Sequence, residues 1–153
     1  MRVRSAVRAD EDLVLAWAND AAARAASFQT ESISRETHHR WFAERMADPH
    51  SSRIWIGLDG KRPIGVVRVD PADDGVHVVS ITLDPAVRGR GRSRPLLEAG
   101  LEAARAAVSA SRFRAWIRDE NRASIALFTG AGFEPPPREP ADMPPGWIVL
   151  ERD

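Results

Sequence analysis

The chain contains no cysteine and no tyrosine. Without cysteine it has no disulfide bond, no thiolate ligand for a metal ion and no thiol nucleophile, so its chemistry must use oxygen and nitrogen groups. No segment approaches the run of roughly eighteen apolar residues that a membrane-spanning helix needs, and the N-terminal residues lack the apolar centre of a signal peptide. We therefore expect a cytoplasmic protein that does not bind a membrane.

The chain also has no excess of either charge, because it contains 22 basic and 22 acidic residues. The chain thus lacks the surplus positive charge typical of proteins that coat nucleic acid, and we expect no nucleic-acid partner. Every basic residue except Lys61 is an arginine. The 153 residues are enough for one domain, residues 1–153, with a core that needs no metal or disulfide.

Changes in the spacing of apolar residues predict a mixed α and β chain. Asp59-Gly60 suits a tight hairpin turn between two strands, because both positions tolerate positive φ. The predicted strands are residues 2–6, 53–58, 62–70, 76–84, 112–118, 132–134 and 147–152. The predicted helices begin at Asp10, Ser34, about Ser93 and Asn121, and the second to fourth of these strands form an antiparallel meander.

The segment "VRGRGRSR", Val87 to Arg94, lies between a predicted strand and a predicted helix. One interpretation is a basic surface turn or a nucleic-acid-binding segment. The position favours another, because unpaired backbone N–H groups at a helix N-terminus bind anions, and glycines let a phosphate approach the backbone. The segment lacks the Gly-Lys-Ser/Thr ending of a P-loop and the third glycine of a dinucleotide-binding fold.

Two motifs resemble those of the GNAT superfamily of acyl-CoA-dependent N-acyltransferases. Residues 88–93, "RGRGRS", match the family's Gln/Arg-x-x-Gly-x-Gly/Ala motif except at Ser93. About thirty residues later, Asn121 is followed by a helix that closes in Gly132-Phe133, a second signature of the family. The resemblance covers essentially the whole chain and implies a single α+β domain, with a mostly antiparallel, bent sheet flanked by helices.

The resemblance also implies acetyl-CoA as the acyl donor. Its pyrophosphate would bind the loop, and its pantetheine arm would follow the backbone of Ile81 and Leu83, with Asn121 and Phe128 nearby. The loop residues concerned are Arg88, Gly89, Arg90, Gly91, Arg92, Ser93 and Arg94. A backbone N–H near Leu83 would stabilise the negatively charged oxygen that forms when the amine attacks the thioester.

The acceptor is a small-molecule amine in our preferred interpretation. The segments 17–28 and 33–42 resemble amino-sugar N-acetyltransferases of the pseudaminic-acid type, which points to Asn19, Glu31 and His38 as acceptor-side residues. Ribosomal-protein N-terminal acetyltransferases share part of this pattern and give a second hypothesis. A non-catalytic acyl-CoA-binding domain is a third. The sequence does not set the oligomeric state, and a homodimer stays open.

Candidates for proton transfer are few. His77 stands where the histone-acetylating branch of the family has its glutamate base, although a histidine on a sheet face is as often structural. Many relatives place an acidic tyrosine where this chain has Phe128, so Ser124 or water would protonate the thiolate here. His38 and His39 are adjacent and point in different directions on a helix, while His50 suits a surface loop, so we expect no metal site.

Overall fold

The computed structural model describes residues 1–48, 53–72 and 74–153, so His50 lies outside the described residues. The strands are β1 (Arg2–Ser5), β2 (Arg53–Asp59), β3 (Arg62–Pro71), β4 (His77–Leu83), β5 (Phe113–Arg118) and β6 (Trp147–Arg152). The α-helices are α1 (Glu11–Ala18), α2 (Ala21–Ala25), α3 (Arg35–Ala47), α4 (Ser93–Val108) and α5 (Arg122–Gly130), with 3-10 turns η1 (Arg8–Asp10) and η2 (Pro85–Val87). Within the described residues, no helix is both long and apolar enough to span a bilayer.

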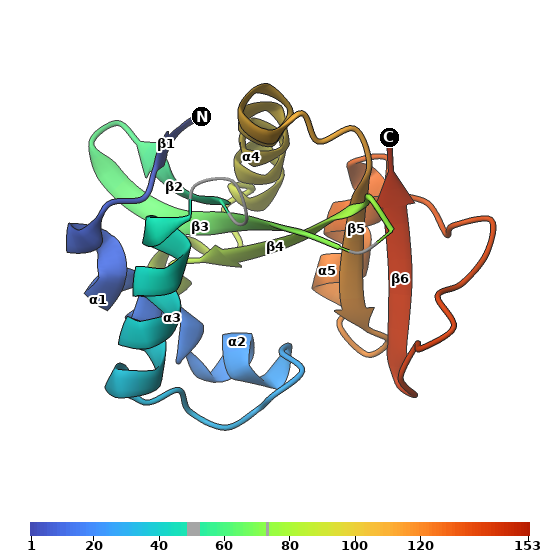
Figure 1. Ribbon diagram of the computed structural model, residues 1–153, viewed down its shortest axis with the longest axis horizontal. Helices are drawn as coiled ribbons and strands as arrows, with labels where there is room; N and C mark the ends of the chain where they lie inside the picture. The colour runs from blue at the N-terminus through green and yellow to red at the C-terminus, as the bar shows by residue number, and fades with distance from the viewer. Residues whose placement is uncertain (49–52, 73) are drawn as a thin grey trace.

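The strands form one six-stranded sheet in the order β1-β2-β3-β4-β5-β6. All neighbours are antiparallel except β4 and β5, which are parallel because α4 connects them. The predicted α+β class with a mostly antiparallel sheet is confirmed. Figure 1 shows the sheet bending, so that β5 and β6 are turned away from the direction of β2 to β4.

Each face of the sheet carries its own apolar core. On one face, α4 buries Leu96, Leu97 and Leu101 against a cluster that includes Val67 and Phe113. On the other face, α1 and α3 cover a second cluster that contains Trp17, Phe42 and Ile56, among others. In Figure 1 these helices lie on opposite sides of the central strands, α4 above and α1 to α3 below. The two faces are therefore separate environments for any residue that projects from β4.

The parallel strands β4 and β5 pair over only two positions. The register joins His77 to Phe113 and Val78 to Arg114, and it continues no further along either strand. From Val79 onward β4 pairs only with β3 in the ladder, so its other backbone edge opens toward β5. This divergence leaves a wedge at the carboxyl ends of both strands, where the loops that follow them also lie.

Local chain signals explain most of the elements. The Ser34 hydroxyl caps α3 by accepting a hydrogen bond from the N–H of Thr37 at 3.1 Å. The expected tight hairpin is present one residue further along: Asp59 still pairs with Arg62, and the turn residues are Gly60, at a φ of +62°, and Lys61. The predicted strand at 132–134 is wrong, because only Glu134 forms a bridge, to Glu151.

The start of α1 differs from the prediction that Asp10 caps it. The Asp10 carboxylate instead forms two hydrogen bonds with the guanidinium of Arg4, at 2.7 and 2.9 Å, and accepts the N–H of Val7 at 2.8 Å. Asp10 is only 6% exposed, so this ion pair compensates a buried charge. The short helix α2 was not predicted, since five residues, four of them alanine, are too few and too uniform to show helical spacing.

Gly65 allows α4 to approach the sheet where β4 ends, and we predict that it does not tolerate a side chain. A Cβ there would meet Leu96 Cδ2 and the carbonyl oxygen of Thr82, each at 2.7 Å. Gly65→Ala should lower the free energy of unfolding by about 1–3 kcal/mol in urea denaturation. In the control Gly130→Ala the nearest atom is 3.9 Å away, so stability should stay equal or rise. Equal effects of the two substitutions would contradict this packing argument.

Candidate functional site

The loop after β4 has the backbone geometry of an anion-binding turn. Asp84 accepts the N–H of Ala86 at 2.9 Å and starts the turn η2. Gly89 and Gly91 then have φ values of +72° and +69°, which other residues adopt only with strain. Helix α4 begins at Ser93, so its first N–H groups and its positive end face this loop.

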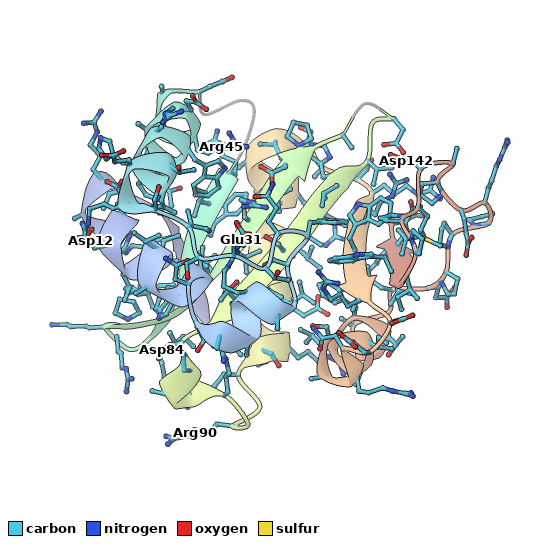
Figure 2. The ribbon with its side chains drawn as sticks, turned by 90° about the horizontal axis from the view of Figure 1, so that it is seen from below. Asp12, Glu31, Arg45, Asp84, Arg90 and Asp142 are labelled. Carbon is cyan, nitrogen blue, oxygen red and sulfur yellow. The ribbon has the colours of Figure 1, made fainter. Side chains whose placement is uncertain are left out.

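The four arginines of the loop have different positions. Arg88 lies 2.7 Å from Asp20, and Arg92 lies 2.9 Å from Asp59 on the β2–β3 hairpin. Arg90 is exposed and points outward at the edge of the molecule in Figure 2, where Asp84 lies on the same side. Arg94 reaches toward the end of α5, near Gly130. Arg90 and Arg94 are both exposed and can interact with a bound phosphate.

The other residues that we expected to contact the cofactor lie around the wedge between β4 and β5. Ile81 and Leu83 project toward the α4 core, while their backbone lies on the edge that opens toward β5. Asn121 caps α5 by accepting the N–H of Ser124 at 3.2 Å. Phe128 is 4% exposed and packs edge-on against Phe133, so its ring belongs to the core. The loop, the edge of β4 and the start of α5 thus meet at one end of the sheet.

A pocket of about 570 Å³ lies on the opposite face, beside the carboxyl end of β5. Helix α2 and the loop after it form one wall, and the end of β5 forms the other. The lining residues are Asn19, Ala21, Arg24, Ala25, Thr30, Ser32, Arg118 and Glu120. Most of them are exposed, so the pocket is an open depression. Glu120 was not singled out from the sequence, since nothing there indicates that α2 folds against the end of β5.

Polar side chains hold the segment after α2 in place over the sheet. The Asn19 amide donates to the carbonyl of Ile33 at 2.8 Å and accepts its N–H at 2.7 Å. Arg24 donates to the carbonyls of Ala18 and Gln29 at 2.6 and 2.9 Å. We expected Asn19 to bind the acceptor. Its side-chain amide instead forms hydrogen bonds with this segment and so shapes the pocket wall.

An aromatic cluster secures the same segment to β5 and β6. Phe28 stacks on Trp147 with ring centroids 3.9 Å apart and meets Trp116 edge-on at 6.2 Å. The Arg118 guanidinium lies 4.7 Å from the Trp147 ring centroid and donates to the carbonyl of Ser27 at 2.6 Å. The face of β5 that carries Trp116 is thus covered by Phe28, which the strand pattern alone left undecided.

The structure separates the histidines and carboxylates that the sequence suggested for the acceptor side. His38 is 3% exposed between Trp41 and Phe42, so its ring lies in the α3 core and lines no surface. Glu31 is exposed on the segment that crosses in front of the sheet in Figure 2. His77 begins β4 on the same face as Val79, which packs in the α4 core, whereas the pocket lies on the other face. No cluster of three metal-binding side chains occurs in residues 1–48, 53–72 and 74–153.

Comparison with known proteins agrees with this geometry. A model of the Acetyltransferase (GNAT) family matches residues 14–133. The N-alpha-acetyltransferase RimI of Mycobacterium tuberculosis is 31% identical over 100 residues, an alignment that covers 61% of this chain and 58% of that protein. The match therefore spans less than two thirds of that relative's length.

Solved structures give the same result for the fold. A ribosomal-protein-alanine N-acetyltransferase from Brucella melitensis superposes with a TM-score of 0.78 at 24% identity, covering 99% of both chains. YncA of Salmonella typhimurium, solved with acetyl-CoA, superposes with a TM-score of 0.78 at 21% identity, covering 99% of this chain and 92% of that one. These similarities extend over nearly the full length of the chain.

Burial of His38 predicts a stability that depends on pH. Burial lowers the pKa of His38 below the ordinary value of 6.5. The charges of Glu11 and Asp12 raise this pKa in part, and His39 lowers it further. Below about pH 6.5 the unfolded chain binds a proton that folded His38 excludes, so stability is full above that pH and falls as acid is added. The loss should approach, at most, about 1.4 kcal/mol per pH unit in urea unfolding.

His38→Leu should remove this component between pH 7.5 and about 5, where ordinary carboxyl groups stay ionised. The control His39→Gln changes an exposed histidine that lies 2.8 Å from Glu11, and it should retain the acid sensitivity. Parallel pH profiles for the wild type and His38→Leu would show that His38 does not carry the effect.

Proposed function

Because the chain belongs to the acetyltransferase (GNAT) family, we propose that it transfers the acetyl group of acetyl-CoA to a primary amine. The observation that carries this proposal is the wedge between β4 and β5, with the glycine loop at its mouth. A thioester in the wedge would lie between the backbone edge of β4 and the pocket across the sheet. The two substrates would thus approach from different faces of one opening.

The donor site would use mainly backbone groups. The N–H groups of the loop from Arg88 to Arg94, together with the start of α4, suit the two phosphates of acetyl-CoA. The pantetheine amides would pair with the free edge of β4 at Ile81 and Leu83, extending the ladder as another strand would. A backbone N–H near Leu83 would stabilise the oxyanion of the tetrahedral intermediate, which requires no particular side chain.

The acceptor site would be the pocket beside α2. The amine must lose a proton before it attacks the thioester, and an ordinary carboxylate or imidazole can accept it directly or through water. Glu120 is the one carboxylate among the residues that line this pocket. His77 remains the alternative base, although the alternation of β4 directs it to the α4 face. The departing thiolate, with a pKa of about 8.5, can take a proton from water or from Ser124.

For the acceptor, we favour the N-terminal amine of a polypeptide over a nucleotide-linked amino sugar. Thr30, Ser32 and Glu120 are exposed, and an open depression of this kind can admit an extended chain. The relative at 31% identity is named as an N-alpha-acetyltransferase, which supports the same class. The amino-sugar hypothesis stays as the competing acceptor in the assay described below.

Acetyl-CoA binding should depend on the glycine geometry of the loop. Gly91→Ala places a Cβ at a φ of +69° with open space around it, so only backbone strain of about 1–2 kcal/mol opposes the native turn. The dissociation constant for acetyl-CoA should rise about tenfold in calorimetric titration. Gly75→Ala is the matched control, because Gly75 has a φ of +80° and equally open space in the β3–β4 turn. The affinity of this variant for acetyl-CoA should stay unchanged. Equal losses in both variants would remove the loop from the binding site.

Activity should appear as release of free coenzyme A, followed with a thiol reagent that the cysteine-free protein cannot consume. We expect turnover with peptides that have a free N-terminus and none with the same peptides blocked. Glu120→Gln should then reduce kcat/KM about 10²-fold or more, with a smaller effect of His77→Asn. Turnover of nucleotide-linked amino sugars alone would reject the peptide acceptor. A larger loss in His77→Asn would return the role of base to His77.

A further inference from the structure

Arg88 joins the glycine loop to the acceptor side of the sheet. Its Nη1 lies 2.7 Å from Asp20 Oδ2, and its Nη2 donates to the carbonyl of Leu83 at 3.2 Å. Both side chains are largely covered, with 33% exposure for Arg88 and 21% for Asp20. The guanidinium therefore bridges the end of β4 and the start of α2.

Asp20 connects this bridge to the pocket wall. Its Oδ2 also accepts the N–H of Ala23 at 3.2 Å, which makes Asp20 the N-cap of α2. The next residues, Ala21, Arg24 and Ala25, line the pocket. A helix of five residues has no stability of its own, so the position of this wall depends on its anchors.

We infer that Asp20 is a positioning residue that couples occupancy of the glycine loop to the order of the pocket wall, an inference that rests on the proposed function. A phosphate bound by the loop N–H groups fixes the backbone of Arg88, and the guanidinium then fixes α2 through Asp20. Coupling of this kind is reciprocal, so an ordered wall also favours the loop conformation that binds acetyl-CoA. The acceptor would bind more tightly once the donor is in place.

The charge state of Asp20 agrees with this role. The hydrogen bond from Arg88 is the main cause that lowers the pKa of Asp20 below its ordinary value, so the carboxylate is ionised at neutral pH. A second arginine of the same loop also pairs with an aspartate and serves as a comparison. Arg92 and Asp59 form a similar pair at 2.9 Å, but Asp59 belongs to the β2–β3 hairpin and is remote from α2 in the chain.

Hydrogen exchange with coenzyme A as the probe tests the coupling without any acceptor. The amides of Arg24, Ala26 and Ser27 report on α2, because each donates to a carbonyl within the segment 20–24. In the wild type, saturating coenzyme A should slow exchange at residues 88–96 and also at these amides, the latter about fivefold. Asp20→Asn keeps a side-chain oxygen that can cap α2 but removes the charge. It should preserve protection of residues 88–96 and lose the response of α2.

The matched variant Asp59→Asn should retain the response of α2, because it removes the other pair of the loop. Protection of α2 in Asp20→Asn equal to that in the wild type would overturn the inference. The inference would also be overturned if coenzyme A protected residues 88–96 of the wild type and left hydrogen exchange in α2 unchanged. This second test does not depend on the folding of any variant. Failure of coenzyme A to bind at all would reject the proposed function together with the coupling, and so distinguishes the two.

Discussion

The parallel contact between β4 and β5 is the constraint on which the rest of the site depends. It joins only two residue pairs, His77 with Phe113 and Val78 with Arg114, before the strands separate. Antiparallel neighbours on both sides hold the two strands elsewhere, so the sheet stays continuous while it opens in its middle. Because both strands run the same way, the loop after β4 and the start of α5 meet at the open end. A longer parallel ladder would close the edge of β4 against backbone ligands.

The two faces of the sheet are built differently. The α4 face is a packed apolar core, and the loop at its edge offers backbone N–H groups at a helix N-terminus. The opposite face carries α1 to α3, whose connecting segment is held by polar side chains and one aromatic stack. The ion pair of Arg88 with Asp20 is a direct link between the two faces.

Local signals predicted most of the strands and helices, and packing between distant segments explains what they missed at the site. Gly89 and Gly91, the caps Ser34 and Asn121 and the glycine of the β2–β3 turn act within a few residues, so their effects can be predicted from the sequence. The Asn19 amide bonds to Ile33, fourteen residues further along the chain, so its use could not be predicted from its neighbours. Glu120 lines the pocket because α2 folds against the end of β5, and these two segments are 90 or more residues apart in the chain. A resemblance to a family cannot supply such contacts either, since they belong to this chain's own packing.

The stack of Phe28 on Trp147 has an optical consequence. The protein has no tyrosine, so its near-ultraviolet emission comes almost entirely from five tryptophans. Trp17 and Trp55 are buried in the two cores, whereas Trp116 and Trp147 lie beneath the segment that borders the pocket. Displacement of that segment would uncover these two indoles to water and shift their emission to longer wavelength. The molecule thus carries an intrinsic fluorophore at the point where its second substrate would enter.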